Sequence, residues 1–116
     1  MSADLISVVS VRGMKPVTAP KDLIYIGRRS GGWPASPLAN PYKLPYESQL
    51  QREAVKQQYR LWLWERMKAN DSAVIAELDR IAAKVAAGET VQLGCWCSPL
   101  PCHGDVIRAA VLGRIR

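Results

Sequence analysis

The residues best suited to chemistry stand near the end of the sequence, in a stretch that holds all three cysteines and the only histidine. Four side chains that bind metals or perform nucleophilic and acid–base chemistry occur within nine residues: Cys95, Cys97, Cys102 and His103. Asp105 follows two residues after His103. These residue types fit three kinds of site, and the spacing separates them.

A zinc site is the first. One histidine with three cysteines is a known structural zinc set, and Cys95, Cys97, Cys102 and His103 would supply it. Zinc ligands, however, usually come as pairs from two separate parts of the chain. Here two of the four are adjacent and no second half exists. The spacing therefore makes zinc the alternative, and no cofactor is assigned from the sequence.

An anion site is the second. Cys102, His103 and Gly104 are expected to begin a helix, whose amino end carries partial positive charge and favours a phosphate. The same field favours the thiolate of Cys102, which makes this cysteine a candidate nucleophile with His103 as acid or base. Asp105 is placed to orient the histidine or a substrate hydroxyl. Gly104 and Cys97 would lie against the ligand.

A packed loop is the third. Cys95 and Cys97 stand on one face of a predicted strand, with Trp96 on the other, and free cysteines are commonly buried as small apolar residues. On this interpretation His103 merely caps the helix. The residue types alone leave the three interpretations open.

The second half of the candidate site follows another predicted strand. Gly27 lets the backbone turn or approach a ligand closely, and Arg28 is positioned to grip a phosphate with two parallel hydrogen bonds. The long loop that follows, Ser30–Pro45, is rich in glycine and proline. Loops of this length are often functional. In it, Gly31 and Gly32 suggest a hinge.

Three further residues of that loop are candidate ligand contacts: Trp33, Asn40 and Tyr42. Trp33 would cover the ligand as a ring, and the Asn40 amide would orient it. The alternative is a loop that only packs Trp33 and Tyr42 on the core.

Apolar patterning predicts the elements that position these residues. Strands are expected at Leu5–Val11, Asp22–Arg28 and from Thr90, and helices at Tyr46–Asn70, Ser72–Ala87 and Val106–Leu112. Trp62 and Trp64 lie on the first of these helices, and their side chains are expected to pack in the protein core. The connection between the first two strands is too short for a helix, which favours an antiparallel return or a wide loop to a distant strand.

The two-helix crossover is long enough to pair the second and third strands in parallel. The predicted fold is therefore a small α/β domain over residues 1–116, three-layered, with a mostly parallel sheet of three to four strands and flanking helices. The carboxyl end of the second strand and the segment before Cys95 would then share one edge of the sheet, which is where ligands bind in open α/β sheets.

Composition limits the class of partner. The formal net charge is +6, which suits a partner with phosphates, either a nucleotide, a phosphorylated metabolite or a nucleic acid. No apolar run approaches the roughly 20 residues that span a bilayer, and the first residues lack a signal-peptide pattern. A cytoplasmic location without membrane contact is therefore expected, and nothing indicates an oligomeric state.

Three motifs together resemble a known family. They are YIGR at Tyr25–Arg28, LANPY at Leu38–Tyr42, and GCWCSPLPCHGDVI at Gly94–Ile107. The combination is similar to the domain of unknown function numbered 4326, which occurs in bacteriophages and bacteria. The resemblance implies that these motifs matter and that a phage origin fits the chain. It implies no activity.

These observations favour the binding of a nucleotide or similar phosphorylated small molecule. Arg28 and the helix amino end would hold the anion, and Cys102, His103 or Asp105 would carry any hydrolysis or transfer. Whether a reaction occurs is left open. The alternative function is a non-catalytic phage accessory protein that binds a host protein or nucleic acid.

Overall fold

The computed structural model describes residues 2–41, 49–96 and 103–115. Its regular elements, in chain order, are η1 (Ser2–Asp4), β1 (Ile6–Ser10), η2 (Pro16–Thr18), β2 (Leu23–Tyr25), α1 (Gln49–Lys68), α2 (Ser72–Ala86), β3 (Val91–Cys95) and α3 (His103–Arg114). The α/β class predicted from the sequence is confirmed: three parallel strands combine with three helices. No helix in these ranges is long and apolar enough to cross a membrane.

The sheet has the strand order β1-β3-β2, and both pairings are parallel. Tyr25 in β2 lies opposite Gly94 in β3, and Ser10 in β1 lies opposite Cys95. The chain therefore leaves β1, passes the position of β3 and enters the far edge of the sheet as β2. Of the two connections considered for the first strands, the wide loop is the one adopted.

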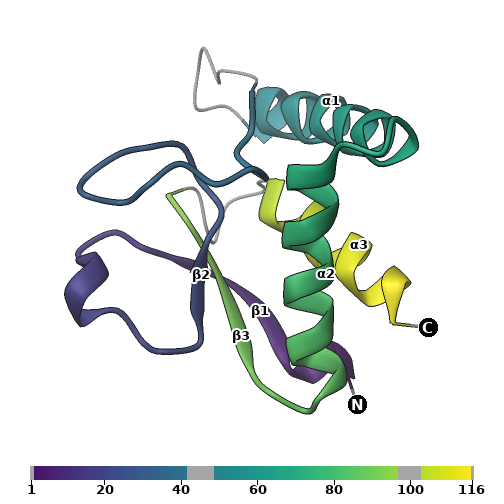
Figure 1. The fold of residues 1–116 in the computed structure, drawn as a ribbon. Helices are drawn as coiled ribbons and strands as arrows, with labels where there is room; N and C mark the ends of the chain where they lie inside the picture. Colours follow the sequence, from purple (N-terminus) through teal and green to yellow (C-terminus); the bar gives the residue numbers. More distant parts are fainter. Residues whose placement is uncertain (1, 42–48, 97–102, 116) are drawn as a thin grey trace.

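One face of the sheet packs against the helices, which Figure 1 shows gathered at one side of the strands. Ile24, Leu93 and Cys95 point to this face, where they join a core built with α2 and α3. Leu78 and Ile81 of α2 are fully buried in the same core. Burying a side chain of this size contributes about 1.5–3 kcal/mol, so this face supplies most of the stabilising burial.

The opposite face is covered by loops. Val11, Tyr25 and Trp33 form a small second cluster there. Four partly buried side chains pack against it: Leu23 of β2, Met14 and Ala19 of the β1–β2 connection, and Trp96 after β3. Within the described residues, this third layer consists of loop segments and the short 3-10 helix η2.

The two long helices follow their sequence patterns. In α2 the Asp71 carboxylate caps the first turn by accepting from Val74 N at 3.3 Å, and Gly88, with φ of 85°, follows the last turn as expected. In α1, Tyr59 and Leu63 are buried and Trp62 packs against the core. The prediction for Trp64 is wrong: its side chain is 55% exposed, because it lies on the outward side of α1.

Candidate functional site

The ends of the parallel strands converge at one edge of the sheet, as the sequence predicts. Beyond the last paired residues, Ile26 N still donates to Gly94 O at 3.0 Å, and Val11 N donates to Cys95 O at 2.9 Å. The first turn of α3 is brought to the same edge by His103. Three segments therefore meet here: the end of β2, the end of β3 and the start of α3.

His103 links β2 to α3. Its side chain is only 6% exposed, and Nε2 lies 2.7 Å from Ile26 O. Since a carbonyl oxygen only accepts, Nε2 carries the proton and donates this bond. Burial lowers the pKa of His103, with the nearby Arg28 charge lowering it further, while the bond to Ile26 and the Asp105 charge oppose the shift. His103 is therefore neutral near pH 7 and positions the start of α3.

Tyr25 holds the backbone at Arg28 through a hydrogen bond. Its hydroxyl donates to Arg28 O and accepts from Trp96 Nε1, the latter at 2.9 Å. Burial raises the pKa of Tyr25, so the hydroxyl keeps its proton. The phenol lies so close to Gly27 that a Cβ there would come within 2.5 Å of Tyr25 Oη. Gly27 is thus required for the close approach of the tyrosine.

Arg28 extends from this turn toward the loop that carries Asn40. Its Nε donates to Asn40 O at 2.8 Å, so it is the Asn40 backbone that meets the arginine. Within the described ranges, the Arg28 terminal nitrogens make no hydrogen bond. The Arg28 charge contributes to the lowered pKa of His103, so the guanidinium acts electrostatically on the first turn of α3.

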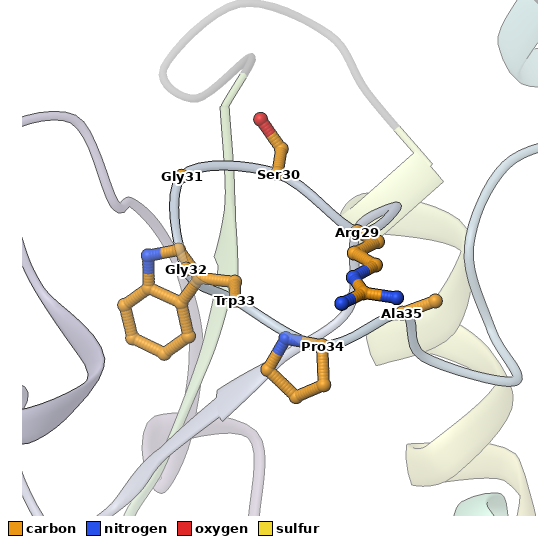
Figure 2. A pocket seen from close by; sticks show the side chains of 7 residues that line it. All are labelled: Arg29, Ser30, Gly31, Gly32, Trp33, Pro34 and Ala35. Atoms are coloured by element: carbon orange, nitrogen blue, oxygen red, sulfur yellow. The ribbon is translucent and has the colours of Figure 1, made fainter.

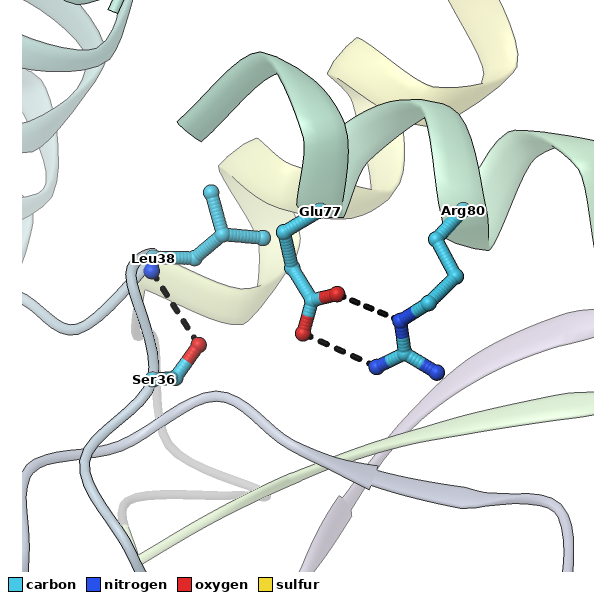
Figure 3. Close-up of polar contacts among 4 residues, drawn as sticks. All are labelled: Ser36, Leu38, Glu77 and Arg80. Carbon is cyan, nitrogen blue, oxygen red and sulfur yellow. Dashed lines mark hydrogen bonds and ion pairs between the residues drawn. The ribbon is translucent and has the colours of Figure 1, made fainter. Parts of the chain in front are cut away.

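The loop that delivers Asn40 is anchored on both sides. Ser36 N donates to Gly27 O at 3.0 Å, and Leu38 N donates to Ser36 Oγ at 3.1 Å. Leu38 is fully buried, and its carbonyl accepts from Tyr59 Oη at 2.6 Å. Figure 3 shows the Leu38 side chain directed toward the helices, beside the Glu77–Arg80 ion pair of α2. The loop is held by buried contacts from β2 to α1.

A second cation comes from α1. Lys56 Nζ lies 3.3 Å from Asp105 Oδ2 in the first turn of α3, and the lysine side chain is 19% exposed. Asp105, placed by the sequence among the catalytic candidates, is in an ion pair. The pairing offsets the negative charge that Asp105 adds to the first turn of α3. Gly104, the remaining candidate of this turn, is buried.

Trp33 takes a different position from the ligand cover that the sequence suggests. Its ring is 5% exposed and stacks on Tyr25 with centroids 5.0 Å apart. Gly31 and Gly32 both have positive φ, and two hydrogen bonds join Ser30 to Trp33. This is a tight two-residue turn, and nothing in its geometry marks a hinge.

This turn borders a hollow of about 550 Å³ lined by residues 29–35. Figure 2 shows the Arg29 side chain beside Pro34 and Ala35, with the Trp33 indole on the other side of the backbone. The indole faces the packed layer over the sheet, away from Arg29. Trp33 is therefore a packing residue here and is not included in the site proposed below.

The cysteine candidates divide into described and undescribed residues. Cys95 is fully buried in the helix-side core. Cys97, Cys102 and Tyr42 lie outside the described residues. Within the described ranges, no three histidine, cysteine or carboxylate side chains gather as metal ligands. Of the alternative zinc set, His103 uses Nε2 for Ile26 O.

Three residues important to this edge were not selected from the sequence: Lys56, Tyr59 and the hydroxyl of Tyr25. Tyr59 supports both halves of the site, since it binds Leu38 O and its ring meets the His103 ring edge-on at 5.1 Å. Its helical stripe had indicated only burial. The spacing Tyr-x-Gly-Arg was the available signal for Tyr25, because a glycine two residues on leaves space for the ring.

The comparisons with known proteins agree with the motif pattern. No curated protein and no solved structure matches the chain. One family model matches residues 9–113, which include the Tyr25–Arg28 turn, the Asn40 loop and the start of α3. The match covers nearly the entire chain and every element of the site, and the chain therefore belongs to the family described as a domain of unknown function, DUF4326.

Proposed function

We propose that the carboxyl edge of the sheet binds a phosphorylated small molecule, with a nucleotide as the expected class. The observation that carries the proposal is the position of Arg28. Its Nε donates to Asn40 O at 2.8 Å, and its charge contributes to the lowered pKa of His103 in the first turn of α3. A guanidinium fixed at Nε presents its terminal nitrogens in a set direction, which suits two bonds to a phosphate.

The surroundings of Arg28 support an anion. The dipole of α3, a 12-residue helix, places partial positive charge at His103. Lys56 compensates Asp105, so the edge keeps a net positive charge. In parallel sheets ligands bind at this end of the strands. Arg28, Lys56 and the start of α3 would then bind the phosphate together.

The described residues support binding more than a reaction. His103 donates Nε2–H to Ile26 O inside the protein, and loss of that proton donor would detach α3 from β2. We therefore assign His103 a positioning role. Cys102, the nucleophile suggested by the sequence, lies outside the described residues and enters no step of the proposal.

The test is a titration with a nucleoside 5′-monophosphate and, separately, with the same nucleoside lacking phosphate. Amide chemical shifts of residues 27–29 and 103–106 report the site. The phosphate-bearing compound should bind and the nucleoside should not. Arg28→Gln should lower the affinity by about tenfold or more, because bonds to a charged group contribute about 1.5–3 kcal/mol.

The matched control is Arg29→Gln, which removes the same charge one residue later on a side chain directed toward Pro34 and Ala35 (Figure 2). It should leave the affinity within about twofold of the parent, as screened surface charges do. Equal losses in the two variants would show nonspecific charge attraction and contradict the proposal. So would an absence of phosphate-dependent shifts at residues 27–29 and 103–106.

A further inference from the structure

A feature outside this edge is the outward side of α1. Leu61 is 65% exposed and Trp64 is 55% exposed, and they are large apolar side chains three residues apart on one helix. Lys68 Nζ lies over the Trp64 ring at 4.1 Å from its centroid. In Figure 1, α1 lies at the periphery of the molecule, beyond α2 and α3. The apolar pair is therefore accessible to a partner.

The outward residues follow the spacing of a coiled-coil seam. Exposed residues recur along α1 at alternating intervals of three and four: Ala54, Gln57, Leu61, Trp64 and Lys68. This is the spacing of the a and d positions of a heptad, through which two helices pack side by side. Leu61 and Trp64 are the large apolar residues among these five positions. The inward residues Tyr59 and Leu63 occupy the opposite side. One face of α1 thus packs in the protein's own core, and the other is exposed within the described part of the chain.

The charges beside this seam could pair with those of a second copy. With Leu61 and Trp64 at a and d, Arg60 precedes the seam at position g and Glu65 follows it at position e, and both are exposed. Glu65 also lies 3.8 Å from Lys68 Nζ of its own helix, an exposed pair that contributes little. In a parallel pair of helices, g of one helix faces the e position five residues later on the other, and such pairs set partner choice. Arg60 would then face Glu65 of a second copy, twice by symmetry.

We propose that the outward face of α1 is a self-association surface, on which two copies of this chain pack their α1 helices in parallel about a two-fold axis. Leu61 and Trp64 of both copies form the centre, and two Arg60–Glu65 pairs flank it. An isologous contact of this kind closes at the dimer. The seam is short, with a 20-residue helix about 30 Å long, so the dimer should dissociate on dilution.

The experiment is sedimentation velocity over a dilution series. The wild-type chain should pass from twice its 12.8 kDa mass toward the monomer as concentration falls. Leu61→Glu should leave a monomer throughout. Arg60→Glu and Glu65→Arg should each raise the dissociation constant by about tenfold or more, since each places like charges in contact across the interface.

The decisive variant carries both changes, R60E and E65R, because it exchanges the charges and restores the pairing. It should dimerise about as well as the wild type. Lys15→Glu, an exposed charge reversal away from α1, is the control and should change nothing. Far-UV circular dichroism verifies that each variant is folded.

A wild-type chain that stays monomeric at every concentration overturns the proposal, including the case in which the face binds another protein or a nucleic acid instead. Single reversals that dimerise like the wild type, or a double variant that does not recover, overturn the parallel arrangement and with it the proposal. Phosphate binding at the sheet edge is measured separately and does not depend on these outcomes.

Discussion

The two faces of the sheet differ in what covers them and in how that cover is held. The helix-side face buries a continuous apolar core with side chains of α2 and α3. The loop-side face has a small cluster around Tyr25 and Trp33, held by specific hydrogen bonds such as Trp96 Nε1 to Tyr25 Oη. Apolar area stabilises the first face, while directional contacts define the second.

This difference separates stability from site geometry. A core of interchangeable apolar residues tolerates repacking, whereas a hydrogen-bonded turn has one arrangement. Arg28 depends on the loop side through Tyr25, and on the helix side through the Leu38–Tyr59 contact. We therefore expect helix-side substitutions to reduce stability and loop-side substitutions to alter binding.

The largest effect is expected for Leu78→Ala. Leu78 is fully buried in the helix-side core, so its truncation leaves a cavity and should lower the free energy of unfolding by about 3 kcal/mol. Denaturant unfolding measures the change. Val17→Ala on the loop side, where Val17 is 90% exposed, is the control and should change stability little. If Leu78→Ala lowered the free energy of unfolding by less than about 1 kcal/mol, the helix-side face would not be the main source of stability.

Gly27→Ala should come next. The new Cβ would meet Tyr25 Oη at 2.5 Å and Cζ at 2.7 Å, so the phenol must shift and release Arg28 O. We expect a loss of about 2 kcal/mol, typical of overpacking, and weaker nucleotide binding. Gly113→Ala is the matched control, since a Cβ there meets nothing within 4 Å. It should be neutral or stabilising in a helix. Equal effects in both variants would argue against the Tyr25 contact.

His103, which joins β2 to α3, predicts that the stability of the fold depends on pH. Burial holds the pKa of His103 below its ordinary value of 6.5, so the unfolded chain binds this proton more readily than the folded one. The free energy of unfolding should therefore have its full value above pH 6.5. It should fall as the pH drops below 6.5, by up to about 1.4 kcal/mol per pH unit.

His103→Gln should flatten this dependence between pH 6.5 and 5.5, because the chain contains one histidine. Chemical denaturation at several pH values measures both slopes. If the wild type and the variant lost stability equally over this interval, His103 would not be the group responsible.

The smallest change in stability is expected for Tyr25→Phe, about 1 kcal/mol for a lost hydroxyl. The ring should stay stacked on Trp33, so the loop-side cluster remains. The bond to Arg28 O is lost, however, and the affinity for the nucleotide should fall although the core is intact. Unchanged affinity would show that the loop side does not position Arg28. Val9→Ala, a partly buried change in β1, serves as the comparison.

Much of the fold was predictable from local patterns. The apolar face and terminal glycine of α2 fixed its ends to within one residue: Ser72–Ala86 against an expected Ser72–Ala87. Helix periodicity and capping depend on residues a few positions apart, so they can be predicted from the sequence. The parallel pairing of β2 with β3 followed from the length of the crossover between them.

Other features depended on contacts far apart in the chain. Trp64 and Tyr59 lie on the same helix and are both aromatic, yet one is exposed and the other buried. Only the placement of α3 and the Leu38 loop decides between them. The same holds for His103, whose partner Ile26 O is 77 residues away. A ring that donates to a distant carbonyl has no sequence pattern distinct from a catalytic histidine.

The sequence by itself determined the α/β class, the limits of α2, and the three motifs that meet at the sheet edge, because each depends on spacing along the chain. The tertiary structure decided the roles within that edge. It directs His103 to Ile26, Lys56 to Asp105 and Tyr25 to Arg28. These pairings join segments brought together only by packing, where burial and hydrogen-bond direction select one partner among many.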